Sequence, residues 1–258
     1  MEITMKRILI ALCLAPLLWS GASAAQDQEA PNLGAIEIFM CNYNKGKGSN
    51  DLDRAVAKWN AWADKANFVP YNAWTLTPMF ASPDYSFDVG WLGAWQDGES
   101  MGKGLQQWKN DGGAMQAEFD KVLTCSVHTS YTSANFKPQQ GDWPEKGLTV
   151  FSDCTVAEGK ALEDSIAAHG NWAKHLTESG SKAGMWAFYP MFGGGDEGYH
   201  YKIVMAHPDY VSLGNDTNNY TNGGGWKVAR ETSQGVVSCN TPRVYDSVLR
   251  RNGGVTGD

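Results

Sequence analysis

Residues 74–80 read Trp-Thr-Leu-Thr-Pro-Met-Phe, and residues 186–192 read Trp-Ala-Phe-Tyr-Pro-Met-Phe. Trp74, Pro78, Met79 and Phe80 therefore each find the same residue type 112 positions later. Four identities at one offset are hard to obtain by chance, and self-similarity at a fixed period indicates a repeated structural unit. The pair of stretches predicts that the chain holds two copies of one unit.

Further matches surround these stretches at offsets of 110 to 114 positions. We interpret the chain as one unit at 35–138 and a second at 148–251, joined by a polar linker at 139–147 and followed by a tail at 252–258. The first-unit landmarks are Leu52, Val56, Trp59, Trp62, Phe87, Trp95, Asp97, Met101 and Trp108, which match Leu162, Ile166, His169, Trp172, Tyr199, His207, Asp209, Leu213 and Tyr220.

The N-terminus has the pattern of a secretory signal. Lys6 and Arg7 precede an apolar run at 8–19, and an Ala-x-Ala sequence ends at Ala24, so we expect cleavage before Ala25 and a short tail at 25–34. The alternative is a membrane anchor, but crossing a bilayer takes roughly 20 apolar residues. We expect a periplasmic or extracellular protein that is not inserted in the membrane after cleavage.

Four cysteines follow the signal, and an even number in an exported chain predicts disulfides. Cys41 and Cys125 are 84 positions apart, and Cys154 and Cys239 are 85 apart, which predicts one bond within each unit. The alternative is a set of metal ligands. No Cys-x-x-Cys or His-x-x-x-His pattern accompanies these cysteines, so we expect no metal site.

The sequence pattern of the first unit predicts the element order β-α-β-β-α-β. Residues 35–42, 71–80, 86–95 and 122–132 have the composition of strands. Asp51 is the expected N-cap of a helix that buries Leu52, Val56 and Trp59, and Asp97 is the expected N-cap of a second helix. This order is that of a ferredoxin-like unit, whose helices cover one face of the sheet and leave the other face bare.

We expect the two bare sheet faces to pack against each other, which gives an α+β fold of two tandem ferredoxin-like repeats. This layout resembles the dimeric α/β-barrel superfamily, fused here into one chain that acts as a monomeric pseudo-dimer. The resemblance is one of layout, and the superfamily includes cofactor-free monooxygenases, isomerases, haem enzymes such as chlorite dismutase and dye-decolourising peroxidases, and proteins with no known activity. A shared fold does not fix the reaction.

The third strand of each unit carries ionisable residues on the face that we expect between the sheets. Alternation places Asp88 with Leu92 and Ala94 in the first unit, and His200 with Lys202 in the second. We predict Asp88, His200 and Lys202 as catalytic residues, with His200 and Lys202 forming an acid/base or anion-binding pair. The alternative is that they lie at an exposed end of the sheet.

Four further residues are candidate ligand contacts: His207, Trp91, Trp95 and Tyr201. His207 replaces Trp95 just before the expected helix N-terminus at Asp209, where anions bind well. The alternative for these residues is that they fill the core.

His169 replaces Trp59 on the first helix of the second unit. A single histidine on an apolar face is usually a core residue, although a haem or metal site would also produce such a departure from the repeat. We expect no cofactor, with haem as the alternative.

Two classes of function remain. The first is an exported protein that binds or transforms a small molecule between its two sheets. The second is a non-catalytic envelope or interaction protein whose duplication closes the core. The net charge of -7 argues against a nucleic-acid partner, and the sequence has no recognisable nucleophile motif, phosphate loop or metal cluster.

Overall fold

The computed structural model describes residues 33–83, 86–195 and 197–255. The expected signal peptide at 1–24 lies outside these residues. The strands are β1 (Gly34–Tyr43), β2 (Asn72–Phe80), β3 (Val89–Trp95), β4 (Leu123–Lys137), β5 (Lys146–Val156), β6 (Gly184–Phe192), β7 (Tyr201–His207), β8 (Val237–Cys239) and β9 (Arg243–Arg251). The helices are α1 (Ser49–Lys65), α2 (Gly98–Asp111), α3 (Gly113–Asp120), α4 (Leu162–Glu178), α5 (Tyr210–Thr221) and α6 (Gly225–Ser233).

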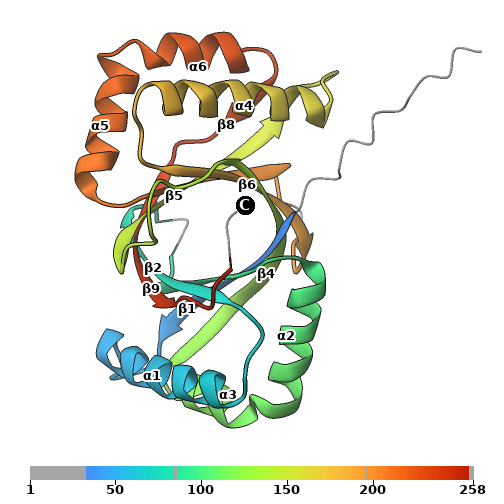
Figure 1. Ribbon diagram of the computed structural model, residues 1–258, viewed down its shortest axis with the longest axis vertical. Helices are drawn as coiled ribbons and strands as arrows, with labels where there is room; N and C mark the ends of the chain where they lie inside the picture. Colours follow the sequence, from blue (N-terminus) through green and yellow to red (C-terminus); the bar gives the residue numbers. More distant parts are fainter. Residues whose placement is uncertain (1–32, 84–85, 196, 256–258) are drawn as a thin grey trace, which may run out of the picture. The chain divides into compact units, whose positions relative to one another are not determined.

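Eight strands form a closed antiparallel barrel in the order β7-β6-β4-β1-β3-β2-β9-β5, and the ring closes because β5 also pairs with β7. Figure 1 looks along this barrel, with α1, α2 and α3 outside one part of its wall and α4, α5 and α6 outside another. The short β8 pairs with the end of β5. The expected α+β class is therefore confirmed.

The barrel closes where strands from the two parts of the chain pair at their edges. We call Gly34–Lys137 the first half of the chain and Lys146–Arg251 the second half. In the first half β1 lies between β3 and β4, and in the second half β5 lies between β7 and β9. The halves meet through β2 with β9 and β4 with β6, so their hydrogen bonds run continuously around the wall.

Alternation along each strand divides its side chains between the barrel interior and the helix-covered outer face. The interior cluster contains residues of both halves, among them Ile36, Leu92, Tyr131, Phe188 and Val204. The expectation that Leu92 and Ala94 face the space between the sheets is confirmed, since both belong to this cluster. On the outer face of the first half, α1 buries Leu52, Val56 and Trp59.

Side chains fix the starts of the helices. Asp97 and Asp209 cap α2 and α5 as expected, and each carboxylate accepts a backbone N–H three residues ahead at 2.7 Å. The expected N-cap at Asp51 is wrong by three residues. Gly48 holds that position, and Asp51, inside the first turn, accepts the Gly48 backbone N–H at 3.2 Å.

Both expected disulfides are present. Cys41 on β1 is bonded to Cys125 on β4, and Cys154 on β5 is bonded to Cys239 on β8. Each bond joins two residues that are direct partners in strand register. A loop of this length contributes roughly 4 kcal/mol on the chain-entropy model.

Candidate functional site

A pocket of about 610 Å³ lies on the outer face of the first half, between the barrel wall and α1, α2 and α3. We call it the first-half pocket. Aromatic side chains make up much of its lining, with Glu37 and His128 among them. The aromatic residues are Phe39, Trp59, Phe68, Tyr71, Trp91, Trp95, Trp108 and Phe119.

Glu37 is the centre of a chain of hydrogen bonds in this pocket. The residue is only 8% exposed, and its two carboxylate oxygens have different partners. The Tyr71 hydroxyl donates to Oε1 at 2.6 Å, and Nε2 of His128 lies 2.9 Å from Oε2. Trp91 in turn donates its indole N–H to the Tyr71 hydroxyl at 2.8 Å. The carboxylate is thus held from two sides by groups that line the same pocket.

Strand register places these groups together. Glu37 on β1 is opposite Gly93 on β3, and a Cβ atom at Gly93 would lie 1.8 Å from the Tyr71 hydroxyl oxygen. Only glycine therefore leaves room for Tyr71 to reach Glu37. On the other side, Phe39 is opposite His128 on β4, and the two rings stack with centroids 3.7 Å apart and planes within 14°.

The arrangement keeps Tyr71 protonated and assigns one ring nitrogen of His128 to the Glu37 carboxylate. Burial and the adjacent Glu37 carboxylate raise the pKa of Tyr71 well above its usual value, so this residue stays a hydroxyl donor. A neutral His128 that donates its Nε2 proton to the carboxylate keeps Nδ1 as the proton acceptor of the ring. The His128 side chain is 51% exposed, so a ligand can reach this ring.

The second half carries different side chains at the corresponding strand positions. Val150 on β5 is opposite Met205 on β7, where β1 and β3 have Glu37 and Gly93. His169 on α4 is buried and hydrogen-bonds the hydroxyl of Tyr201 through Nε2 at 2.8 Å. Burial lowers the pKa of His169 to about 4, so the ring is neutral. The carboxylate and histidine pair of the pocket thus belongs to the first half.

No protein-family model and no curated protein sequence matches this chain. Solved structures do match. A candidate chlorite dismutase aligns over 88% of this chain and 98% of its own, with a TM-score of 0.51 and 12% identity. A candidate monooxygenase from Lactobacillus acidophilus aligns over 85% and 95%, with a TM-score of 0.54 and 10% identity. A chlorite dismutase variant from Candidatus Nitrospira defluvii aligns over 86% of this chain and 93% of its own, with a TM-score of 0.52 and 6% identity.

The chain has the dimeric α/β-barrel fold. Identities this low establish the fold alone, and a dimeric α/β barrel hosts many chemistries. The residues of the site must therefore be judged by their own geometry. Within the described part of this barrel, no helix combines the length and apolar character needed to span a membrane.

The residues predicted as catalytic do not form one site in the barrel. Asp88 and His200 are exposed, and each accepts a backbone N–H at a strand end, from Tyr43 at 2.8 Å and from Val156 at 3.0 Å. Lys202 points into the barrel interior, where its Nζ lies 2.5 Å from the carboxylate of Asp153. Lys202 therefore forms an ion pair with Asp153 and not the expected pair with His200.

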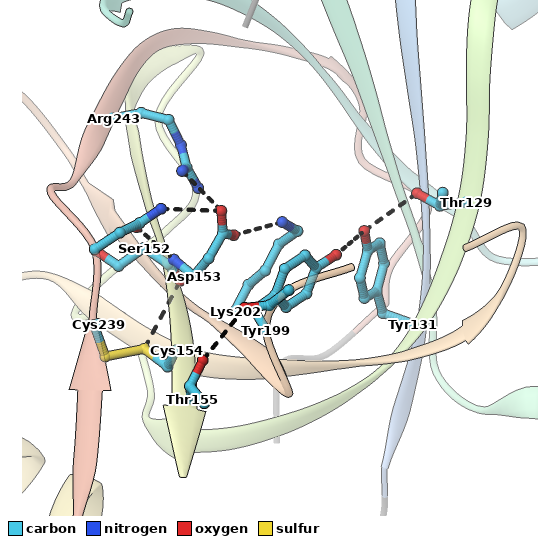
Figure 2. A network of polar contacts seen from close by, with 12 residues as sticks. Thr129, Tyr131, Ser152, Asp153, Cys154, Thr155, Tyr199, Lys202, Cys239 and Arg243 are labelled. Atoms are coloured by element: carbon cyan, nitrogen blue, oxygen red, sulfur yellow. Dashed lines mark hydrogen bonds and ion pairs between the residues drawn. A yellow bond between two sulfur atoms is a disulfide. The ribbon is translucent and has the colours of Figure 1, made fainter. Parts of the chain in front are cut away.

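Figure 2 shows the network around Lys202. Arg243 also binds the Asp153 carboxylate, at 2.8 Å, and the Lys202 ammonium lies 3.9 Å from the centre of the Tyr199 ring. Burial alone would raise the pKa of Asp153, but the hydrogen bonds from Arg243 and Lys202 lower it. Burial lowers the pKa of Lys202, and Asp153 opposes this shift. Each buried charge thus has a partner of opposite sign.

The predicted ligand contacts are divided among three places. Trp91 and Trp95 line the first-half pocket. His207 is buried beside a pocket of about 110 Å³ in the barrel interior, with Nδ1 3.6 Å from the carboxylate of Asp216. Tyr201 is fully buried and packs against His169 under α4. The predicted contacts are therefore not gathered between the sheets, and the larger of these two pockets lies on the outer face.

The sequence interpretation missed Glu37, Tyr71 and His128. One signal was available for Glu37, because it is the only charged residue in the apolar strand at 35–42. A charge at such a position needs a partner. Nothing local in the sequence identifies His128 or Tyr71 as that partner, since they are 91 and 34 positions away.

Haem, which the resemblance allows, does not fit His169 or His207. An axial histidine presents a ring nitrogen to the iron from an open pocket. His169 uses Nε2 for Tyr201 within a packed cluster, and His207 borders an interior pocket of about 110 Å³, too small for a porphyrin. His128 differs from both, because Nε2 binds Glu37 while Nδ1 has the open first-half pocket beside it, so this histidine alone among the three does not argue against haem. Cys154 and Cys239 lie near His169 but are bonded to each other.

Proposed function

We propose that the protein binds a small aromatic molecule in the first-half pocket and abstracts a proton from it with His128. The observation that carries the proposal is the buried Glu37 carboxylate, which lies between His128 and Tyr71 inside an aromatic pocket. The rings of the lining supply apolar contact area for a planar ligand. A concave apolar site with a few convergent polar groups is the usual form of a small-molecule site.

The roles of the three polar residues follow from their hydrogen bonds. Glu37 orients the His128 ring and stabilises the imidazolium that forms when Nδ1 takes the proton. Tyr71 donates to the other carboxylate oxygen, and Trp91 holds the Tyr71 hydroxyl in place, so the carboxylate does not rotate during the transfer. The electron pair of the broken bond stays on the substrate. The reaction class is therefore proton abstraction by a histidine base, such as an isomerisation or an elimination.

The proposal is tested with 5-nitrobenzisoxazole, a planar probe of a positioned base. The base takes the C3 proton, the C–H electron pair forms the nitrile, the N–O bond breaks, and a coloured phenolate leaves. We expect turnover above the buffer rate, and a loss of about 10²-fold in His128→Ala. His200→Ala, which changes an exposed histidine outside the pocket, should keep the wild-type rate. Equal rates in wild type and His128→Ala would overturn the assignment and favour the non-catalytic alternative.

We also propose that the chain is a duplication of one ferredoxin-like unit, 35–138 and 148–251, with a linker at 139–147. The matching pairing of β1 with β3 and β4, and of β5 with β7 and β9, supports it. Because both halves contribute to one closed barrel, we propose that the protein works as a monomer. Light scattering of the purified protein tests this state. Export after cleavage before Ala25 is proposed from the sequence, and N-terminal sequencing of the mature protein tests it.

A further inference from the structure

The charged side chains that line the first-half pocket are acidic. Among the described lining residues these are Glu37 and Asp120, and no lysine or arginine lines the pocket. His128 is the remaining titratable group beside Tyr71. The negative charge of Glu37 is buried, where low dielectric strengthens its interaction with a ligand charge. An anionic ligand would meet this carboxylate without a lysine or arginine among the lining residues to offset it. The Arg251 guanidinium lies 5.7 Å from the centre of the Trp59 ring but is paired with Asp64.

The aromatic lining of the pocket also favours a cation over an anion. Trp59 and Trp91 meet edge to face with centroids 5.4 Å apart, and Trp91 meets Phe119 in the same way at 5.8 Å. All three rings line the first-half pocket. The face of a tryptophan or phenylalanine carries the negative part of the ring quadrupole and attracts cations.

The Glu37 carboxylate retains capacity for a further partner. Each oxygen has two lone pairs, and the Tyr71 hydroxyl and the His128 ring each use one. A ligand cation near Glu37 therefore need not displace either residue.

We propose that the first-half pocket selects a planar organic cation, such as a protonated aromatic amine or an N-alkylated heteroaromatic ring, over neutral and anionic molecules of the same shape. This inference names the substrate class of the site proposed above and rests on that proposal. It concerns the charge of the ligand, whereas the proposed function concerns the pocket and its base.

Equilibrium dialysis with three bicyclic probes of similar size tests the inference: 1-methylquinolinium, 1-methylnaphthalene and 1-naphthoate. We expect the cation to bind about tenfold more tightly than the neutral hydrocarbon, and the anion to bind most weakly. Glu37→Gln should abolish the preference for the cation while keeping affinity for 1-methylnaphthalene. Glu178→Gln, which removes an exposed carboxylate from α4, is the matched control and should keep the preference.

The outcomes separate the two proposals. If the neutral or anionic probe binds wild-type protein as tightly as the cation, the charge inference is wrong while the pocket stands. If none of the three probes binds, both the inference and the pocket assignment are overturned. Leu105→Trp, at an exposed lining position of α2, should block all three probes, and unchanged binding in it would place them outside the pocket. The comparison of probes in wild-type protein decides the inference even if Glu37→Gln does not fold.

Discussion

Nε2 of His128 lies 2.9 Å from the carboxylate of Glu37, although the two residues are 91 positions apart in the chain. The contact exists because β1 and β4 are antiparallel neighbours. Their register places Phe39 opposite His128, and Glu37, two residues before Phe39, lies on the same face of the sheet. A disulfide between Cys41 and Cys125 joins the same two strands beside the pocket. The geometry of the proposed base is thus fixed by backbone pairing and a covalent bond.

Gly93→Ala should destabilise the protein. The added Cβ would overlap the Tyr71 hydroxyl, which would have to leave Glu37, so we expect a loss of about 1 to 3 kcal/mol in the free energy of unfolding. Urea denaturation measures the change. Gly102→Ala on α2, where a Cβ meets nothing within 4 Å, is the control and should be neutral or slightly stabilising. Equal stability of Gly93→Ala and wild type would contradict the placement of Tyr71.

The two disulfides should affect the pocket differently. Replacing Cys41 and Cys125 by Ser should lower the free energy of unfolding by about 2 to 5 kcal/mol and also weaken 1-methylquinolinium binding, since both cysteines line the pocket. Replacing Cys154 and Cys239 should cost similar stability and leave binding unchanged under native conditions. Dialysis and urea denaturation of the two double variants give the comparison. Equal effects on binding would show that the first bond has no special link to the pocket.

Asp153 should matter more for stability than Lys202. Asp153→Asn leaves Lys202 and Arg243 buried without their carboxylate, and we expect a loss of about 3 to 5 kcal/mol. Lys202→Met keeps the Asp153 pair with Arg243, so the loss should be nearer 2 kcal/mol, the order of one charge-assisted hydrogen bond. Thermal denaturation ranks the two variants. The reverse order would mean that Lys202 has another essential partner.

Stability should fall on acidification because of His169. The pKa of His169 in the folded protein is about 4, below the 6.5 of an unfolded chain, so between these values the unfolded state binds more protons. The contribution is fully present above pH 6.5 and is lost as the pH falls toward 4, with an upper bound of about 3 kcal/mol. His207, whose pKa burial also lowers, adds to the slope.

His169→Gln isolates the first contribution. Its side-chain amide can still hydrogen-bond the Tyr201 hydroxyl, but it does not titrate. Urea denaturation of wild type and variant at a series of pH values should show a shallower fall in the variant between pH 6.5 and 4. Parallel curves would mean that His169 titrates normally in the folded protein.

Local patterns predicted the parts of this protein that depend on neighbours in the sequence. The caps at Asp97 and Asp209 were readable because a cap involves residues three positions apart. Alternation on the third strands placed Leu92 and Ala94 inside the barrel. The cysteine spacing predicted both disulfides, because each pair lies at the same points of two similar segments.

The candidate site depended on information that the linear sequence does not carry. A period of two says which face a residue occupies, but not which strand lies beside it, so Lys202 was expected beside His200 and is found with Asp153. The pocket also depends on the volume of side chains on neighbouring strands, since Gly93 on β3 has no side chain and so leaves room for Tyr71 to reach Glu37 on β1. The sequence determined the elements, the disulfides and the faces. Only the tertiary structure decided the pocket and its Glu37–His128 pair, because strand register and packing between distant segments create both.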